Sequence, residues 1–135
     1  MNRKIVAGSW VIISALLVTI VLTGCDAATG DADRIIQQSL RSPNSFSAVS
    51  HTTLFTGKKA GQPAYIVKVE YDAQNAFGAS VRDCTYVSFY HENDDIKWSQ
   101  MWGLRKCSAD VGNFGFVNVT EDEFVKRLIE NNDFQ

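Results

Sequence analysis

Alternation of apolar and charged side chains over residues 65–72 constrains the fold of this chain more than any other feature. Apolar residues hold the odd positions and charged residues hold the even ones from 68, namely Tyr65, Val67, Val69 and Tyr71 against Lys68, Glu70 and Asp72. Successive side chains of a strand point to opposite sides of a sheet, so period two is the spacing of a strand with one buried face. The segment therefore predicts a half-buried strand within a sheet.

Three further segments have strand character. Residues 46–56 and 81–90 are rich in β-branched and aromatic residues, and a polar turn region over 57–62 precedes the strand at 65–72. The cluster Glu92-Asn93-Asp94-Asp95 predicts a turn, after which a fourth strand begins at Ile96. In that strand four large residues share one parity, interrupted by Gln100, and are expected to form a core face: Ile96, Trp98, Trp102 and Leu104.

The sheet is flanked in sequence by two segments of helical period. Asp31 is positioned to cap a helix that begins near Ala32, and Pro43 marks its end. Thr120-Glu121-Asp122-Glu123 has the form of a capping box and predicts a closing helix from Glu121 to about Asn131. We therefore expect an α+β fold, a four-stranded antiparallel sheet with both helices on one face, and a meander as the simplest strand order.

The N-terminal segment has the organisation of an export signal. Arg3 and Lys4 precede an uncharged, mostly apolar run over residues 5–21, and Leu22-Thr23-Gly24-Cys25 follows. This last element resembles the lipobox of bacterial lipoproteins, in which the cysteine is acylated. The resemblance implies a signal peptide at 1–24, lipid chains such as palmitate on Cys25, a tether over 25–31 and a single domain over 32–135.

Two other interpretations of this segment stay open, an uncleaved membrane span and an ordinary secretory signal. Under the lipoprotein interpretation the domain is anchored to the cell membrane and faces the periplasm or the exterior. Asp26 follows the cysteine and resembles the signal for retention in the inner membrane of a Gram-negative host.

Charge and cysteine content further limit the classes of function and the disulfide pairing that this chain can have. Without Arg3 and Lys4, 11 basic residues stand against 15 acidic ones, a net charge of about −4 on 111 residues. The basic residues are scattered in ones and twos, which disfavours nucleic-acid binding. In an oxidising compartment Cys84 and Cys107 are expected to form a disulfide, the alternative being two buried thiols.

Known catalytic motifs for hydrolases, metalloproteases and nucleotide-binding enzymes do not occur in the sequence. The nearest candidate is His91, beside Glu92, Asp94 and Asp95, where solvated turn residues are the simpler interpretation. His51 is expected to be a half-exposed sheet residue. These observations predict no enzymatic activity, no cofactor and no metal site.

Two segments are candidates for binding a partner. Trp98, Met101 and Trp102 either fill the core or form an interface. Residues 112–116 either extend that interface as an aromatic loop, or one additional strand accounts for Phe116, Val117 and Val119. In Asn75-Ala76-Phe77-Gly78 we expect a turn closed by Asn75, with Phe77 folded back over the sheet end. The alternative is a recognition loop that presents Gln74, Asn75 and Arg82.

Residues 32–90 resemble a widespread group of small exported bacterial domains. The similarity lies in Leu40-Arg41-Ser42-Pro43-Asn44-Ser45 and in the segment from Tyr65 to the turn Ala73-Gln74-Asn75-Ala76-Phe77-Gly78. Ala76 and Ala79 depart from the residues common in that group. The resemblance implies a fold and an envelope location but supplies no mechanism.

Together these patterns predict a lipid-anchored envelope protein that binds another protein at the membrane. A phage or plasmid exclusion or immunity lipoprotein is one alternative. A cell-wall-modifying hydrolase with an unrecognised site near His91 is another.

Overall fold

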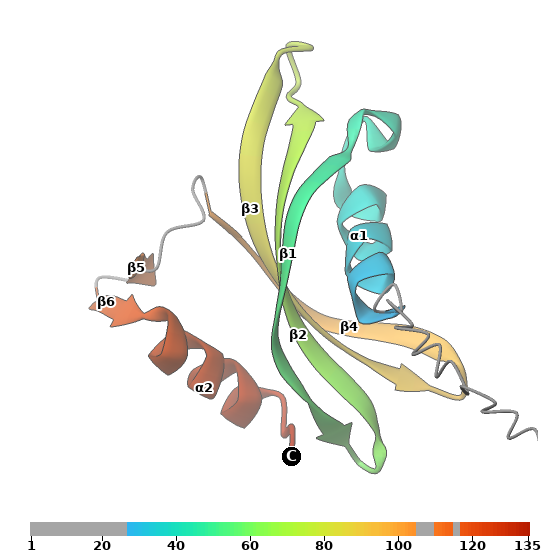
Figure 1. Cartoon of the computed structure of the whole chain (residues 1–135), viewed down its shortest axis with the longest axis vertical. Helices are drawn as coiled ribbons and strands as arrows, with labels where there is room; N and C mark the ends of the chain where they lie inside the picture. The colour runs from blue at the N-terminus through green and yellow to red at the C-terminus, as the bar shows by residue number, and fades with distance from the viewer. Residues whose placement is uncertain (1–26, 105–109, 115–116) are drawn as a thin grey trace, which may run out of the picture.

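The computed structural model describes residues 27–104, 110–114 and 117–135. Within them the chain forms these elements: α1 (Ala27–Ser39), the short 3-10 helix η1 (Pro43–Ser45), β1 (Ser47–Lys59), β2 (Gln62–Gln74), β3 (Ser80–Glu92), β4 (Asp95–Leu104), β5 (Asp110–Phe114), β6 (Val117–Thr120) and α2 (Glu121–Asn131). Strands β1 to β4 make an antiparallel sheet in sequence order (Figure 1). The predicted α+β fold and its meander are confirmed.

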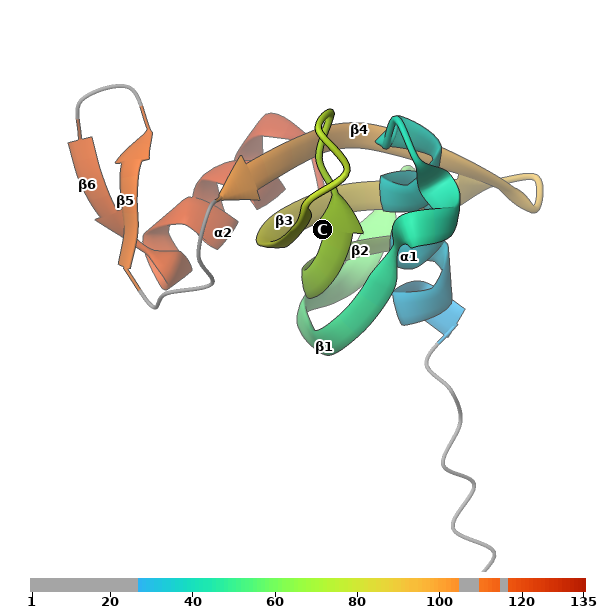
Figure 2. The same ribbon diagram turned by 90° about the horizontal axis from the view of Figure 1, so that it is seen from above.

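The two helices cover opposite faces of the sheet, so the prediction that both lie on one face is wrong (Figures 1 and 2). Ile36 of α1 belongs to the same buried cluster as Val67 and Val69 of β2. Phe124 of α2 belongs to a second cluster with Ile66, which directly precedes Val67 and therefore points to the other side of the strand. The sheet is therefore buried on both faces in its middle, and the odd-position pattern revealed only the α1 face.

The face toward α2 is covered along only part of its length. On β2, Ala64 and Ile66 are fully buried against the α2 cluster, whereas Glu70 and Asp72 on the same side are only partly buried. Lys68 lies between these two regions and binds Glu121 at the start of α2. On β2 the change from apolar to charged residues at the even positions therefore coincides with the end of the surface that α2 covers.

Helix α1 begins at Ala27, five residues before the predicted start. Ala28 and Ala32 are buried against the sheet, and Asp31 lies inside the helix instead of capping it. The segment expected to be a tether therefore belongs to the domain from Ala27 onward. Small residues made it resemble a linker, but alanine is also the residue with the highest helix propensity.

A β-bulge divides β4 and breaks the predicted single-parity stripe. Ser88 pairs with Gln100, whereas the next residue, Phe89, pairs with Trp98. The extra residue reverses the alternation, and as a result Ile96 and Met101 both pack against the α1 cluster. Residues of β4 that share odd or even numbering therefore do not all lie on one face of the sheet.

The C-terminal residues close one edge of the sheet. Gln135 exchanges two backbone hydrogen bonds of 2.7 Å with Lys58 of β1, and the Phe134 ring stacks on Phe55 at 5.8 Å. Gly57 has no side chain because a Cβ there would overlap the Gln135 carbonyl oxygen and the Phe55 ring. The far end of β1 is thus covered by the chain's own terminus.

The closing helix occupies its predicted range. The Thr120 hydroxyl accepts a hydrogen bond from the Glu123 backbone N–H at 3.3 Å, which is half of the predicted capping box. The Glu123 carboxylate instead binds Arg127 one turn later at 2.6 Å. Before this helix, β5 and β6 pair with each other as a separate ribbon, which agrees with the strand interpretation of that region.

No helix in the described ranges has both the length and the apolar character needed to cross a membrane.

Candidate functional site

The turn between β2 and β3, residues 75–79, is called the tip below and lies at one end of the molecule (Figure 1). The Asn75 N–H donates to the Ala79 carbonyl oxygen at 2.9 Å, and the Gly78 N–H donates to the Asn75 carbonyl at 3.0 Å. The Asn75 side-chain oxygen accepts from the backbone N–H groups of Phe77 and Ala79 at 2.9 and 3.1 Å. Gly78 takes a positive φ of 79°. The predicted closure of the turn by Asn75 is confirmed, and it fixes the loop conformation.

Phe77 is 94% exposed, so the prediction that it folds back over the sheet end is wrong. Asn75 alone closes the turn and leaves the ring free to point outward. The end of the core beneath the tip is filled by Phe46 and Tyr71, whose ring centroids are 5.2 Å apart. The Phe77 ring therefore buries almost no surface in the folded protein, and it projects from a turn that is held by internal hydrogen bonds.

Two shallow hollows flank the tip. The first, with a volume of about 470 Å³, is called the tip cavity below, and it is lined by Leu40, Ala73, Gln74, Asn75, Val81, Arg82 and Asp83. The second is lined by residues 41–45 around η1 together with Gln74. Phe77 therefore stands beside concave surface on which a bound partner can place side chains.

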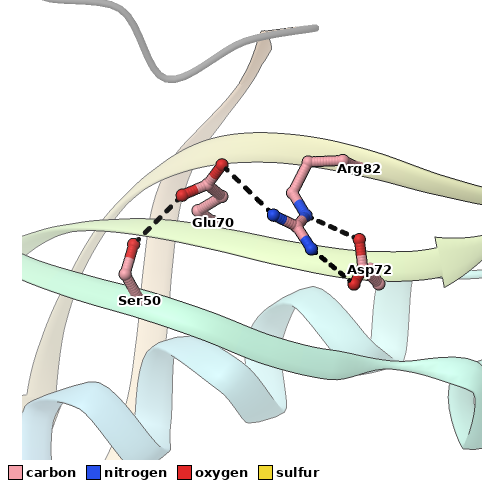
Figure 3. A network of polar contacts seen from close by, with 4 residues as sticks. All are labelled: Ser50, Glu70, Asp72 and Arg82. Carbon is pink, nitrogen blue, oxygen red and sulfur yellow. Dashed lines mark hydrogen bonds and ion pairs between the residues drawn. The ribbon is translucent and has the colours of Figure 1, made fainter.

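A polar network crosses the sheet next to the tip (Figure 3). Arg82 of β3 donates two hydrogen bonds to Asp72 of β2 at 2.7 and 2.8 Å, and its guanidinium lies 3.9 Å from Glu70. Glu70 in turn accepts from Ser50 of β1 at 3.3 Å. The hydrogen bond from Arg82 holds the pKa of Asp72 below its usual value. The Arg82 guanidinium is therefore already engaged on this face.

The structure does not bring the predicted partner-binding residues together. Asn75 lies at the tip, and Met101 packs against the α1 cluster on β4. Trp98 and Trp102 are within β4, where they pair with Phe89 and Tyr86 in the backbone register, and their side chains lie outside the described part. Phe77 was missed as a surface residue because large aromatic residues are usually buried.

The predicted disulfide and the predicted lipidation each involve a cysteine that lies outside the described residues. Cys84 is fully buried on β3, whereas Cys107 falls in the range 105–109. The disulfide between them stays a prediction. Cys25 also lies outside the described residues, and its lipidation stays a prediction as well.

The two histidines fasten α1 to the sheet. His91 binds Asp31 at 2.9 Å and His51 binds Asp33 at 2.8 Å. His91 packs near the rings of Tyr65 and Phe89, and its side chain is 27% exposed. Glu92, Asp94 and Asp95 are exposed in the turn, as predicted. Across the residues that the structure describes, no three His, Cys, Asp or Glu side chains are grouped to hold a metal ion.

Comparison of the chain with protein-family models, curated proteins and solved structures finds no match. The function is therefore inferred from the geometry of the tip and from the sequence.

Substitution of Asn75 by alanine should lower the free energy of unfolding by about 1 kcal/mol, because two side-chain hydrogen bonds that fix the tip are lost at an exposed position. Urea titration followed by circular dichroism measures the change. Gln74→Ala is the matched control, since its exposed side chain lies next to the turn without closing it. Equal stability of the Asn75 and Gln74 variants would show that the turn does not depend on Asn75.

Proposed function

We propose that this protein is a lipid-anchored cell-envelope protein that binds another protein through the tip. The observation that carries the proposal is the 94% exposure of Phe77 on a turn fixed by Asn75. Aromatic residues dominate the binding energy of many protein interfaces. A loop that is already held in one conformation also loses little entropy when it binds.

The placement of the tip supports a protein partner over a lipid surface. Asp31, in the first turns of α1, binds His91 near the end of β3, whereas the tip precedes Ser80 at the other end of that strand. His91 is eleven positions after Ser80 on β3, which corresponds to about 35 Å of strand. The start of α1 and Phe77 therefore lie at opposite ends of β3.

Because α1 begins at Ala27, lipid on Cys25 would place the membrane at the end of the domain opposite the tip. Only Asp26 stands between Cys25 and Ala27 in the sequence, so lipid on Cys25 would hold the start of α1 within about 7 Å of the acylated residue. The tip would then project away from the membrane. In this orientation Phe77 meets proteins of the envelope before it meets the anchoring bilayer.

Crosslinking in intact cells tests the binding role. A photoreactive amino acid at Ala76 reports on whatever contacts the tip, and the bound protein is identified by mass spectrometry. We expect a specific adduct that Phe77→Ala reduces at least tenfold, because the main apolar anchor is lost. Val49→Ala is the matched control, since Val49 is also exposed, at 45%, but lies on β1.

The same experiment separates the alternatives. An adduct that persists in Phe77→Ala but is lost in Trp98→Ala or Trp102→Ala would move the interface to β4 and overturn the tip as the binding site. Adducts with phospholipid alone would indicate membrane insertion of the tip. Mass spectrometry of the mature N-terminus tests the anchor separately, and an unmodified chain that begins at Met1 would overturn the lipoprotein assignment.

A further inference from the structure

The tip cavity combines an apolar floor with one carboxylate. Leu40 directly after α1, Ala73 from β2 and Val81 from β3 supply the apolar lining, and Asp83 of β3 also lines the cavity. Val81 remains 39% exposed, so this lining is open to solvent. Apolar and anionic groups in one small cavity suit a ligand with both an alkyl portion and a positive charge.

Asp83 is partly buried, yet no hydrogen bond or ion pair of the described residues engages its carboxylate. Its charge lies close to the sheet interior: burial raises the pKa of the Tyr71 hydroxyl, and Asp83 adds to that rise. A partly buried carboxylate without a cation is costly compared with a paired one. Binding of a cation at Asp83 would remove that cost.

Arg82 also lines the cavity but does not neutralise Asp83. Its guanidinium is 53% exposed and engaged by Asp72 and Glu70 (Figure 3). Arg82 and Asp83 are consecutive on β3, so their side chains point to opposite faces of the sheet, and Asp72 and Glu70 already balance the arginine on its own face. The carboxylate of Asp83 is thus the one charge of the cavity lining that these contacts leave unbalanced. The surface beside Phe77 is therefore complementary to a basic partner.

We propose that the tip cavity binds an arginine or lysine side chain of the partner protein. The methylene groups of that side chain pack against Leu40 and Val81, and its charged group pairs with Asp83. Phe77 then contacts the partner beside this basic residue. The inference rests on the proposed function, because it names the chemistry that the tip recognises.

A titration followed by nuclear magnetic resonance tests the cavity without knowledge of the partner. The probe is N-acetyl-arginine methylamide, and the control probe is the corresponding citrulline compound, which has nearly the same shape but no charge. We expect the arginine probe to shift the methyl signals of Leu40 and Val81 with saturation in the millimolar range. Citrulline should cause at least tenfold weaker binding because it cannot form the ion pair.

Asp83→Asn should weaken binding of the arginine probe at least tenfold. Asp94→Asn is the matched control, since it removes the same charge from an exposed turn outside the cavity. Equal binding of the two probes, or equal effects of the two substitutions, would overturn the proposal. Unchanged far-UV circular dichroism of both variants ensures that any loss reflects the cavity and not unfolding.

The chain's own basic residues are the competing occupant. β4 ends at Leu104, which pairs with Cys84, and Arg105-Lys106 follow in the sequence. If the probe binds only after both are replaced by glutamine, the cavity is occupied internally and an external ligand is excluded. Loss of the cellular adduct in Phe77→Ala but not in Asp83→Asn would leave the proposed function standing and refute the basic-ligand inference.

Discussion

Phe89→Ala and Phe124→Ala are each expected to lower the free energy of unfolding by about 3–5 kcal/mol, the range for a large aromatic residue removed from a core. Phe89 is fully buried on the α1 face, where its ring lies 5.4 Å from Tyr65. Phe124 is buried on the α2 face, where it meets Tyr86 edge to face at 5.2 Å. Urea or thermal unfolding of the purified domain measures both losses.

A milder pair of substitutions tests whether the two clusters are independent. Ile36→Val and Phe124→Leu should each cost about 1 kcal/mol, and their effects should add to within about 0.5 kcal/mol, because the sheet separates the two sites. Tyr86→Phe with Phe124→Leu is the matched control pair, since those two rings are in contact. Strong coupling between Ile36 and Phe124 would contradict the arrangement of helices on opposite faces.

The strands were predictable because their patterns are local. The alternation over 65–72 identified β2, and the turn residues before Ile96 identified the β3–β4 hairpin, in which Asn93 and Asp94 adopt positive φ. The start of α2 was predictable for a similar reason, since Thr120 marks it within one turn. In each case neighbouring residues alone determine the structure.

The errors arose where a distant contact decides the outcome. Asp31 has the chemistry of a helix cap, but His91 binds it from 60 residues away and α1 extends past it to Ala27. A bulge opposite Ser88 and Phe89 broke the parity on β4, and neither the sequence of β3 nor that of β4 signals it. Helix α2 packs on the sheet face that carries both Ile66 of β2 and Tyr86 of β3. The pattern of one strand alone does not predict that face.

The candidate site was predicted in part. Asn75 was identified as the residue that closes the turn, because an Asx side chain accepts from the backbone two residues later. The exposure of Phe77 was missed because hydrophobicity predicts burial, whereas the turn geometry leaves the ring without a core to reach. The tip cavity joins Leu40 with Val81 and Asp83, and only tertiary structure brings these residues together.

Glu121→Gln is expected to lower the free energy of unfolding at pH 7 by about 2–3 kcal/mol, the range for hydrogen bonds to a charged group. The carboxylate accepts from Lys68 and from the Tyr86 hydroxyl, both at 2.5 Å, and thereby ties α2 to β2 and β3. Lys68 and Glu121 are only 17% and 22% exposed, so solvent screens this contact less than a surface pair. Chemical unfolding at fixed pH measures the loss.

The pH dependence identifies the charge as the cause. Burial opposes ionisation of Glu121, but the hydrogen bonds from Lys68 and Tyr86 outweigh it and hold the pKa of this carboxyl below its usual value. A carboxylate whose pKa is lowered by folding stabilises the protein above its unfolded pKa, and this contribution disappears as the pH falls through the folded pKa. The stability difference between the protein and Glu121→Gln should therefore be constant near neutrality and shrink below about pH 4.5.

Glu123→Gln on the same helix turn is the control for this effect. Its carboxylate also lies near the N-terminus of α2 and binds a cation, Arg127, but both side chains are about half exposed. Its removal should cost no more than about 0.5 kcal/mol. If Glu121→Gln and Glu123→Gln cost the same, the loss reflects the helix dipole shared by both positions. If only Glu121→Gln is costly and its effect fades in acid, the contact with Lys68 and Tyr86 holds α2 on the sheet.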